Sequence, residues 1–149
     1  MTAWLLAIDP GARSGFSLWQ RRGLTGPLDI IAAWVTAPNV VREHVTPDLV
    51  VIEAPDRIFG KARPRDILKL SRIVGRYEER YRGSEVRLVT PHAWKGSVDG
   101  DIMTDRIRAA LTPREVGFAK GLDHNGLDAI GLGKWALRQP WMRGPVGPW

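Results

Sequence analysis

Residues 4–20 read WLLAIDPGARSGFSLWQ, and this stretch decides the fold. The apolar run that ends at Asp9 has the composition of a buried strand, and the Pro-Gly pair directly after it stops that strand. A second strand-like run, SGFSLWQ, begins at once, so we expect the two runs to form a hairpin. Further along, LDIIAAWV (28–35) predicts a third strand, which places three antiparallel strands at the start of the chain.

The rest of the chain alternates strand and helix signals. DLVVIEAP (48–55) is typical of a buried strand that closes on a glutamate and a proline, and EVRLVTP (85–91) predicts a fifth strand. Helices are predicted from near Pro64, over 101–111 and over 124–138, with a short helix around 39–44. This order predicts an α/β fold in which a mixed five-stranded sheet is flanked by helices.

Length and composition limit the possibilities. With 149 residues, 44% of them hydrophobic, the chain can bury one core, and we expect one domain over 1–138 followed by a Gly/Pro-rich tail over 139–149. A sequence without cysteine has no disulfide and no thiolate metal site, which leaves carboxylate oxygens as ligands for a hard metal. We find neither a basic leader nor a run of about 18 apolar residues, so the expected location is the cytoplasm, with no membrane partner.

Acidic residues stand at the ends of three elements that are far apart in the sequence. Asp9 closes the first strand, Glu53 closes the fourth, and Asp128 lies at the start of the last helix. A turn-forming aspartate and a salt-bridged glutamate are the structural alternatives, although a glutamate in an apolar strand is costly to leave unpaired. Carboxylates from separate elements can hold two magnesium ions about 3.5–4 Å apart for phosphodiester hydrolysis. The pattern therefore favours a metal-dependent nuclease.

The partner of Asp128 stays open at this point. In a regular helix His124 and Asn125 share a face with Asp128, whereas Asp123 lies about 140° around the axis. Asp123 reaches the site only if it precedes or caps the helix, and capping is also its structural alternative. His124 is a candidate ligand or proton shuttle and equally an ordinary surface histidine. Three glycines in GLDAIGLG cost helix stability and therefore predict a close approach to the sheet.

Basic residues are concentrated in one segment. The formal net charge is +6 with a sequence pI ≈ 10.3, and residues 57–87 contain ten Lys or Arg against four acids. Plotted as a helix, this segment has a basic stripe and an apolar stripe roughly 120° apart. The basic stripe is either a solvated face or a phosphate-binding surface, and a carboxylate site beside it favours phosphate. The candidates for DNA contacts are Arg13, Arg57, Lys61, Lys69, Arg72, Arg76 and Lys95.

Four motifs, AIDPGxxSGFSLW, VVIEAP, TPHAWKGSV and DHNGLDAIGLG, resemble in this order the RuvC-like Holliday junction resolvases, particularly the compact versions of phages, poxviruses and plant organelles. The resemblance spans nearly the whole chain and implies an RNase H-like fold. It places a catalytic and metal-binding quartet on Asp9, Glu53, Asp123 and Asp128. It also implies a homodimer, two Mg²⁺ ions per active site that Mn²⁺ can replace, and symmetric nicking of four-way DNA junctions.

This chain departs from the resolvase pattern at one point. Similar proteins often carry a lysine shortly after WKGSV, where Asp99-Gly100-Asp101 stand here. Lys95 or another cation must therefore supply any positive charge that assists the transition state. Its neighbour Trp94 is a candidate wedge at the junction crossover, although core packing is the commoner role of a tryptophan.

Three other functions fit parts of the pattern. An actin-like or sugar-kinase ATPase shares the opening DxG but needs a second half-domain, for which 149 residues leave no room. A nuclease of the same fold that acts on other branched DNA or on RNA–DNA hybrids would keep the same carboxylates. A non-catalytic protein that binds branched DNA would not need to retain all of them.

Overall fold

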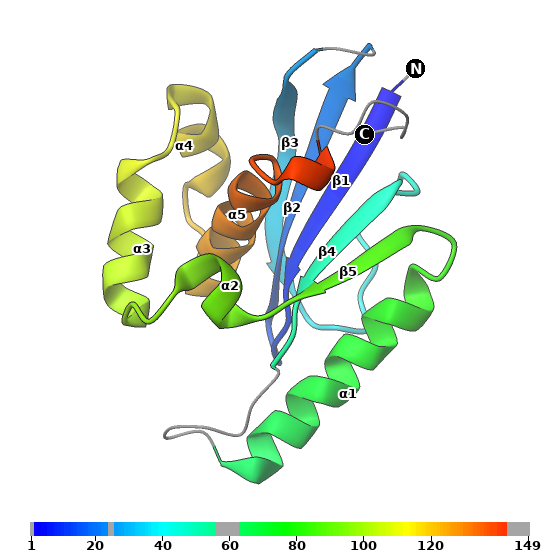
Figure 1. The fold of residues 1–149 in the computed structure, drawn as a ribbon, viewed down its shortest axis with the longest axis vertical. Helices are drawn as coiled ribbons and strands as arrows, with labels where there is room; N and C mark the ends of the chain where they lie inside the picture. The colour runs from blue at the N-terminus through cyan, green and yellow to red at the C-terminus, as the bar shows by residue number, and fades with distance from the viewer. Residues whose placement is uncertain (1, 24–25, 56–62, 143–149) are drawn as a thin grey trace.

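The computed structural model describes residues 2–23, 26–55 and 63–142 and contains one five-stranded sheet of order β3-β2-β1-β4-β5 (Figure 1). The strands are β1 (Thr2–Asp9), β2 (Ser14–Arg22), β3 (Leu28–Thr36), β4 (Leu49–Glu53) and β5 (Glu85–Val89). β1, β2 and β3 pair antiparallel, whereas β4 pairs parallel with both β1 and β5. The predicted mixed sheet, with antiparallel strands first and parallel strands after, is confirmed.

Five α-helices occur within the described residues. They are α1 (Pro64–Arg80), α2 (Pro91–Lys95), α3 (Gly100–Ala109), α4 (Pro113–Ala119) and α5 (His124–Ala136), with a 3₁₀ turn at Pro140–Met142. α1, α3 and α5 were predicted, but α2 and α4 were not, because each is too short to show a periodic pattern. Both begin with a proline after a threonine whose side chain accepts a backbone amide bond. None of these helices is long and apolar enough to cross a membrane.

The short helix predicted around 39–44 is wrong. Residues 37–48 form an irregular connection, with a turn in which the amide of Val40 bonds to the carbonyl of Ala37 at 3.1 Å. Side chains from the end of α1 hold this connection, since Arg80 donates to the carbonyl of Pro38 and the Tyr81 hydroxyl donates to Glu43. These tertiary bonds outweigh a weak local preference for helix.

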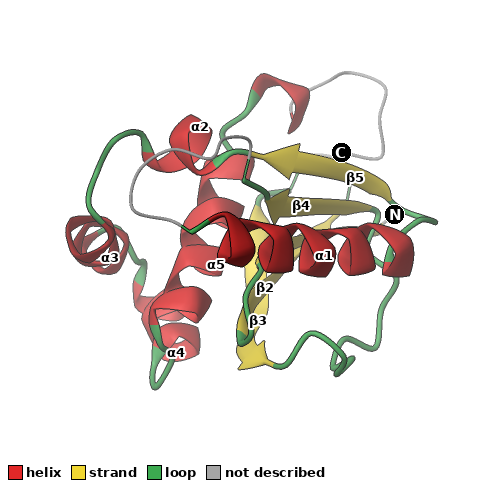
Figure 2. Cartoon of the chain, turned by 90° about the horizontal axis from the view of Figure 1, so that it is seen from below, coloured by secondary structure: helices red, strands yellow, loops and turns green. Residues whose placement is uncertain are grey.

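The sheet separates two apolar layers. Figure 2 shows α1 on one side of the sheet, and α5, with α3 and α4 beyond it, on the other. Because side chains alternate along a strand, Leu5 and Ala7 of β1 pack in the layer that contains α5, whereas Leu6 and Ile8 pack in the layer that contains α1. The parity of a strand residue therefore determines which layer it joins.

Candidate active site

The ends of β1 and β4 bring two carboxylates to one edge of the sheet. The strands are parallel with Ile8 beside Ile52, and Asp9 and Glu53 are the next residues of each strand. Asp9 continues the series of Leu5 and Ala7, and Glu53 has the same parity in β4 as Leu49 and Val51, so both belong to the α5 face. Strand parity and parallel register thus place together two acids that are 44 residues apart.

The helix α5 lies against the strands at very short range, because glycine stands at the contacts. A Cβ on Gly15 of β2 would lie 1.9 Å from the carbonyl oxygen of Asn125, and one on Gly133 would lie 2.3 Å from Nε1 of Trp19. The hydroxyl of Ser17 fixes the contact by donating to the carbonyl of Ala129 at 2.7 Å. The predicted close approach is confirmed, and Gly15, which the sequence reasoning did not single out, supplies the sheet's half of it.

The approach of α5 places Asp128 in a cluster with Glu53 and Lys95. Nζ of Lys95 lies 2.6 Å from Oδ2 of Asp128 and 3.1 Å from Oε2 of Glu53. The three side chains are only 13–17% exposed. Trp94 donates its indole N–H to the same Oε2 of Glu53 at 2.6 Å, and its ring faces the Lys95 ammonium at 4.7 Å. Glu53 therefore does have a salt-bridge partner, the lysine of α2.

Asp9 is a buried carboxyl that lies near other negative charges. Its residue is 6% exposed, and burial raises the pKa of its carboxyl well above the usual value. The negative charges of Glu53, Asp128 and Asp123 raise that pKa further, and the Lys95 ammonium only partly offsets them. All four predicted acids therefore share one electrostatic environment.

Asp123 has the capping role that the sequence offered as its structural alternative, and its role as a metal ligand stays a prediction. Its Oδ1 accepts the amides of Asn125 at 3.0 Å and Gly126 at 3.2 Å, which makes it the N-cap of α5. Its charge also acts on Asp9, while its Oδ2 lies 3.4 Å from Nε of Arg13. His124 is exposed at the first position of α5 and is not among the groups that shift the pKa of Asp9. The charge of Asp123 therefore acts on the cluster, whereas His124 is an exposed residue at the start of α5.

The donor set suits a hard divalent cation. Carboxylate oxygens are the ligands that such a cation prefers, and the repulsion that raises the pKa of Asp9 means that negative charge is in excess around it. In this conformation no group of three or more described His, Asp or Glu side chains has the arrangement that holds a metal ion. The metal-binding role of Asp9, Glu53, Asp123 and Asp128 stays a prediction.

Comparison with known proteins identifies the fold. No protein-family model matches the sequence, and no curated protein is significantly similar to it. Among solved structures, Thermus thermophilus RuvC in complex with a Holliday junction substrate matches with a TM-score of 0.59 at 14% identity, over 89% of this chain and 91% of that chain. The fowlpox virus resolvase in complex with its Holliday junction DNA matches with a TM-score of 0.57 at 13% identity, over 89% and 98%. The chain has the RuvC-like resolvase fold.

Within this RuvC-like fold, the predicted DNA contacts fall in different places. The side chain of Arg13 is 70% exposed beside Asp123, and Lys95 lies inside the acidic cluster. Lys69, Arg72 and Arg76 are exposed on α1, which packs on the opposite face of the sheet from the cluster. The remaining two, Arg57 and Lys61, lie outside the described residues. The basic stripe of α1 therefore lies on the other face of the sheet from the carboxylates. The sequence analysis had placed the stripe and the carboxylates side by side.

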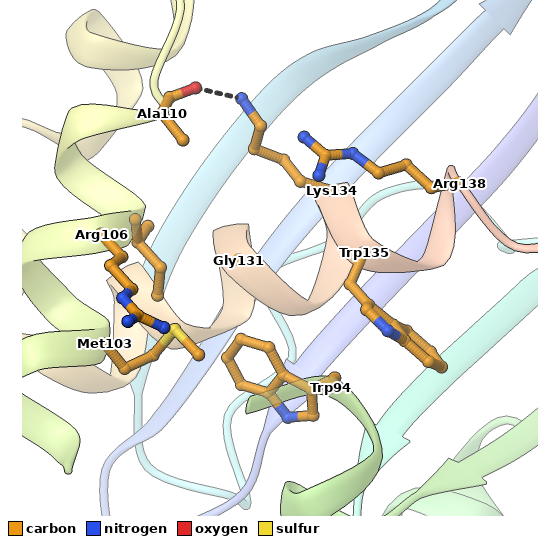
Figure 3. Close-up of a pocket in the computed structure, with 9 residues that line it drawn as sticks. Trp94, Met103, Arg106, Ala110, Gly131, Lys134, Trp135 and Arg138 are labelled. Carbon is orange, nitrogen blue, oxygen red and sulfur yellow. Dashed lines mark hydrogen bonds between the residues drawn. The ribbon is translucent and has the colours of Figure 1, made fainter. Parts of the chain in front are cut away.

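Trp94 packs against α5 and bonds to Glu53, a contact that the sequence analysis did not predict. In Figure 3 its six-membered ring points into a pocket of about 160 Å³, while the indole nitrogen points away from that pocket. A Cβ on Gly131 would lie 3.0 Å from Cζ3 of the same ring, so the indole is held tightly against α5. The only signal for this role was the short TPHAWKG motif. Packing, the commoner role expected for this tryptophan, is what the structure shows.

Proposed function

We propose that this protein is a metal-dependent, structure-selective endonuclease that nicks four-way DNA junctions. The observation that supports this function best is the gathering of four carboxylates from β1, β4 and α5 at one end of the sheet. The fold around them is shared with solved Holliday junction resolvases, which adds to the support. We extend the activity of those proteins to this chain because acids from separate elements are gathered at one end of a shared fold.

In the proposed chemistry the four acids share one role, which is to bind metal ions. Asp9, Glu53, Asp123 and Asp128 would hold two Mg²⁺ ions, or Mn²⁺ in their place, since hard cations prefer carboxylate oxygens. Such ions, when bound, would activate water and stabilise the leaving oxygen of the phosphodiester. The chain's own contribution is geometric. Trp94 bonds to the carboxylate of Glu53, and the cap made by Asp123 fixes the start of α5, so both contacts restrict how these two acids can move.

The symmetry of the substrate supports a homodimer. A four-way junction has two-fold symmetry, and two identical sites related by a two-fold axis can cut opposed strands at equivalent positions. Such paired cuts leave nicks that ligase can seal. Exposed basic side chains on each subunit, including Arg13, would contact phosphates along the arms. We therefore propose that the active form on branched DNA is a dimer of this chain.

Cleavage mapping on a synthetic four-way junction tests the function. Each strand is labelled in turn, and the products are compared after incubation with Mg²⁺, with Mn²⁺ and with EDTA. We expect paired nicks at symmetry-related positions with either metal and none in EDTA, with linear duplex left intact. Faster cutting of flaps or of RNA–DNA hybrids would favour the related nucleases. Tight junction binding without cleavage of any substrate would identify a non-catalytic binding protein.

A further inference from the structure

The acidic cluster holds a cation that belongs to the chain itself. Lys95 makes ion pairs with both Glu53 and Asp128, at 3.1 and 2.6 Å, and is the only Lys or Arg that pairs with either acid among the described residues. Its side chain is 17% exposed, which is unusually low for a lysine. The ammonium therefore lies between two of the carboxylates that the proposed function assigns to metal ions.

The backbone places this lysine in the cluster. Lys95 is the last residue of α2, a helix of five residues that starts at Pro91 behind the capping hydroxyl of Thr90. Gly96 caps the end of the helix with a φ of 66°, which glycine adopts readily, so the chain turns away directly after the lysine. The Trp94 ring lies 4.7 Å from the ammonium and bonds to Glu53 through its N–H. These interactions make Lys95 a fixed part of the cluster.

Charge balance explains why a cation is needed there. Three buried or half-buried acids surround the site in addition to the N-cap Asp123, and Asp9 is strained by their repulsion even with Lys95 in place. Removing the cation would leave two largely buried carboxylates uncompensated, which is strongly unfavourable. A divalent ion bound to Glu53 and Asp128 would lie directly beside the Lys95 ammonium, and the repulsion between these two cations in a largely buried site opposes their binding at the same time.

We propose, building on the nuclease function above, that Lys95 takes the place of a divalent cation in the metal-free protein and must leave Glu53 and Asp128 when these residues bind metal. The ammonium keeps the acids compensated, and so keeps the site folded, without metal. It also weakens metal binding, because each binding event must first break two buried ion pairs.

Direct metal-binding measurements test the competition. Lys95→Met keeps most of the side-chain volume and removes the charge, so we expect it to bind Mn²⁺ in calorimetry about tenfold or more tightly than wild type at the same pH and salt. Lys120→Met is the matched control, because Lys120 is exposed at the end of α4 and its loss changes the net charge equally. Its Mn²⁺ affinity should stay near the wild-type value. Equal or weaker Mn²⁺ binding by Lys95→Met would overturn the proposal.

Thermal unfolding supplies a second, independent readout. In EDTA, Lys95→Met should melt below wild type, and Mn²⁺ should raise its melting temperature more than it raises that of wild type. If the single variant does not fold in EDTA, the double variant Lys95→Met/Asp128→Asn should fold, because it also removes the charge of one of the two carboxylates that the lysine compensates. A double variant no more stable than Lys95→Met would contradict a charge-compensating role.

The result is separable from the proposed function. If the wild-type protein cleaves junctions in Mg²⁺ while Lys95→Met binds metal with the affinity of wild type, the competition is rejected and the proposed nuclease function stands. If Lys95→Met binds Mn²⁺ more tightly but the wild-type protein cuts no branched DNA, the competition stands and the nuclease function is rejected.

Discussion

The two faces of the sheet are built from alternate residues of the same strands, but they pack in different ways. On the α1 face Phe16 stacks on Trp34 with ring centroids 5.1 Å apart and meets Tyr77 edge-on at 5.7 Å. On the α5 face glycine replaces side chains at the contacts, and Ser17 bonds across to the helix backbone. The first face ends in apolar side chains, whereas the second ends in the carboxylates of Asp9 and Glu53.

This difference separates stability from chemistry within one sheet. Aromatic rings on the α1 face bury a large apolar area and favour folding. The α5 face gives up side-chain volume so that a helix can carry Asp128 to the strand ends, where like charges are then held together at a cost to stability. Substitutions on the two faces should therefore have different effects. On the α5 face we expect loss of activity, with or without loss of stability, and on the α1 face we expect loss of stability or no effect.

The largest expected effect follows from removing a carboxylate of the cluster. Asp9→Asn, Glu53→Gln or Asp128→Asn should each lower junction cleavage by about a thousandfold or more, because each removes charge that the proposed metal ions need. Binding of the junction should be retained or become tighter, since repulsion against phosphate falls. Single-turnover cleavage and gel-shift titration measure the two effects separately.

The outer side of α1 supplies the control for this series. Glu79→Gln removes a carboxylate that is exposed on α1 and pairs only with Arg82 of the described residues, at 3.1 Å. Its cleavage rate should match wild type. Near wild-type cleavage by any of the three cluster variants would remove that residue from the active site.

The next largest effect concerns the packing of β2 against α5. Gly15→Ala would drive a Cβ into the backbone carbonyl of Asn125 at 1.9 Å, so α5 would have to move away from the strand ends. We expect a loss of about 3 kcal/mol of unfolding free energy, measured by urea denaturation, and loss of cleavage in the protein that remains folded.

A glycine on α1 offers the opposite result. A Cβ on Gly75 meets nothing within 4 Å, and the position is an exposed helix interior. Gly75→Ala should therefore stabilise the protein by about 0.5–1 kcal/mol without changing the cleavage rate. If Gly15→Ala were as mild as this, close packing of α5 could not be what positions Asp128.

A smaller effect tests whether the exposed stripe of α1 meets DNA. If Lys69, Arg72 and Arg76 bind phosphates, changing all three to Gln should weaken binding to every sequence. The slope of log affinity against log salt should fall in magnitude by roughly 0.9 for each phosphate that is no longer neutralised. The fold should survive, because the packing residues Val74 and Tyr77 are unchanged. An unchanged slope would make the stripe a solvated face and restrict the DNA path to the α5 side.

The smallest effect is on the dependence of stability on pH. Burial and the neighbouring acids raise the pKa of Asp9 in the folded protein, so the folded state binds this proton more strongly than the unfolded state. In EDTA the contribution of Asp9 is therefore most favourable below its unfolded pKa and is lost as pH rises through the raised folded pKa. Asp9→Asn should flatten this loss and gain about 0.5–2 kcal/mol at neutral pH. Asp105→Asn, an exposed acid on α3, should leave the profile unchanged.

Sequence reasoning predicted the parts of the molecule that local patterns encode. Strand periodicity and strand-ending prolines placed Asp9 and Glu53 correctly at one sheet edge, and the glycines of α5 predicted its close approach. The basic and apolar stripes of α1 were also predicted. Periodicity does not say on which face of the sheet such a helix packs. That information comes from the handedness of the β4-α1-β5 crossover, which the strand order makes available.

The missed features depend on interactions between distant segments. Lys95 was named as a DNA contact and as a candidate cation at the active site, but its ion pairs with Glu53 and Asp128 were not predicted, because only the folded sheet brings the three side chains together. The absence of a helix at 39–44 has the same origin, since it depends on Arg80 and Tyr81 from the end of α1. Such interactions are decided by tertiary structure, which local propensity does not describe.

The alternation along β1 also limits how this chain can vary in length. A strand that loses or gains one residue before its acid turns every following side chain over, so Asp9 would enter the aromatic layer beside Phe16 and α5 would receive Ile8. Changes by two residues preserve the orientation. A single-residue change in a loop does not by itself reverse these side chains, whereas the strands ahead of the carboxylates keep their orientation only when insertions and deletions come in pairs.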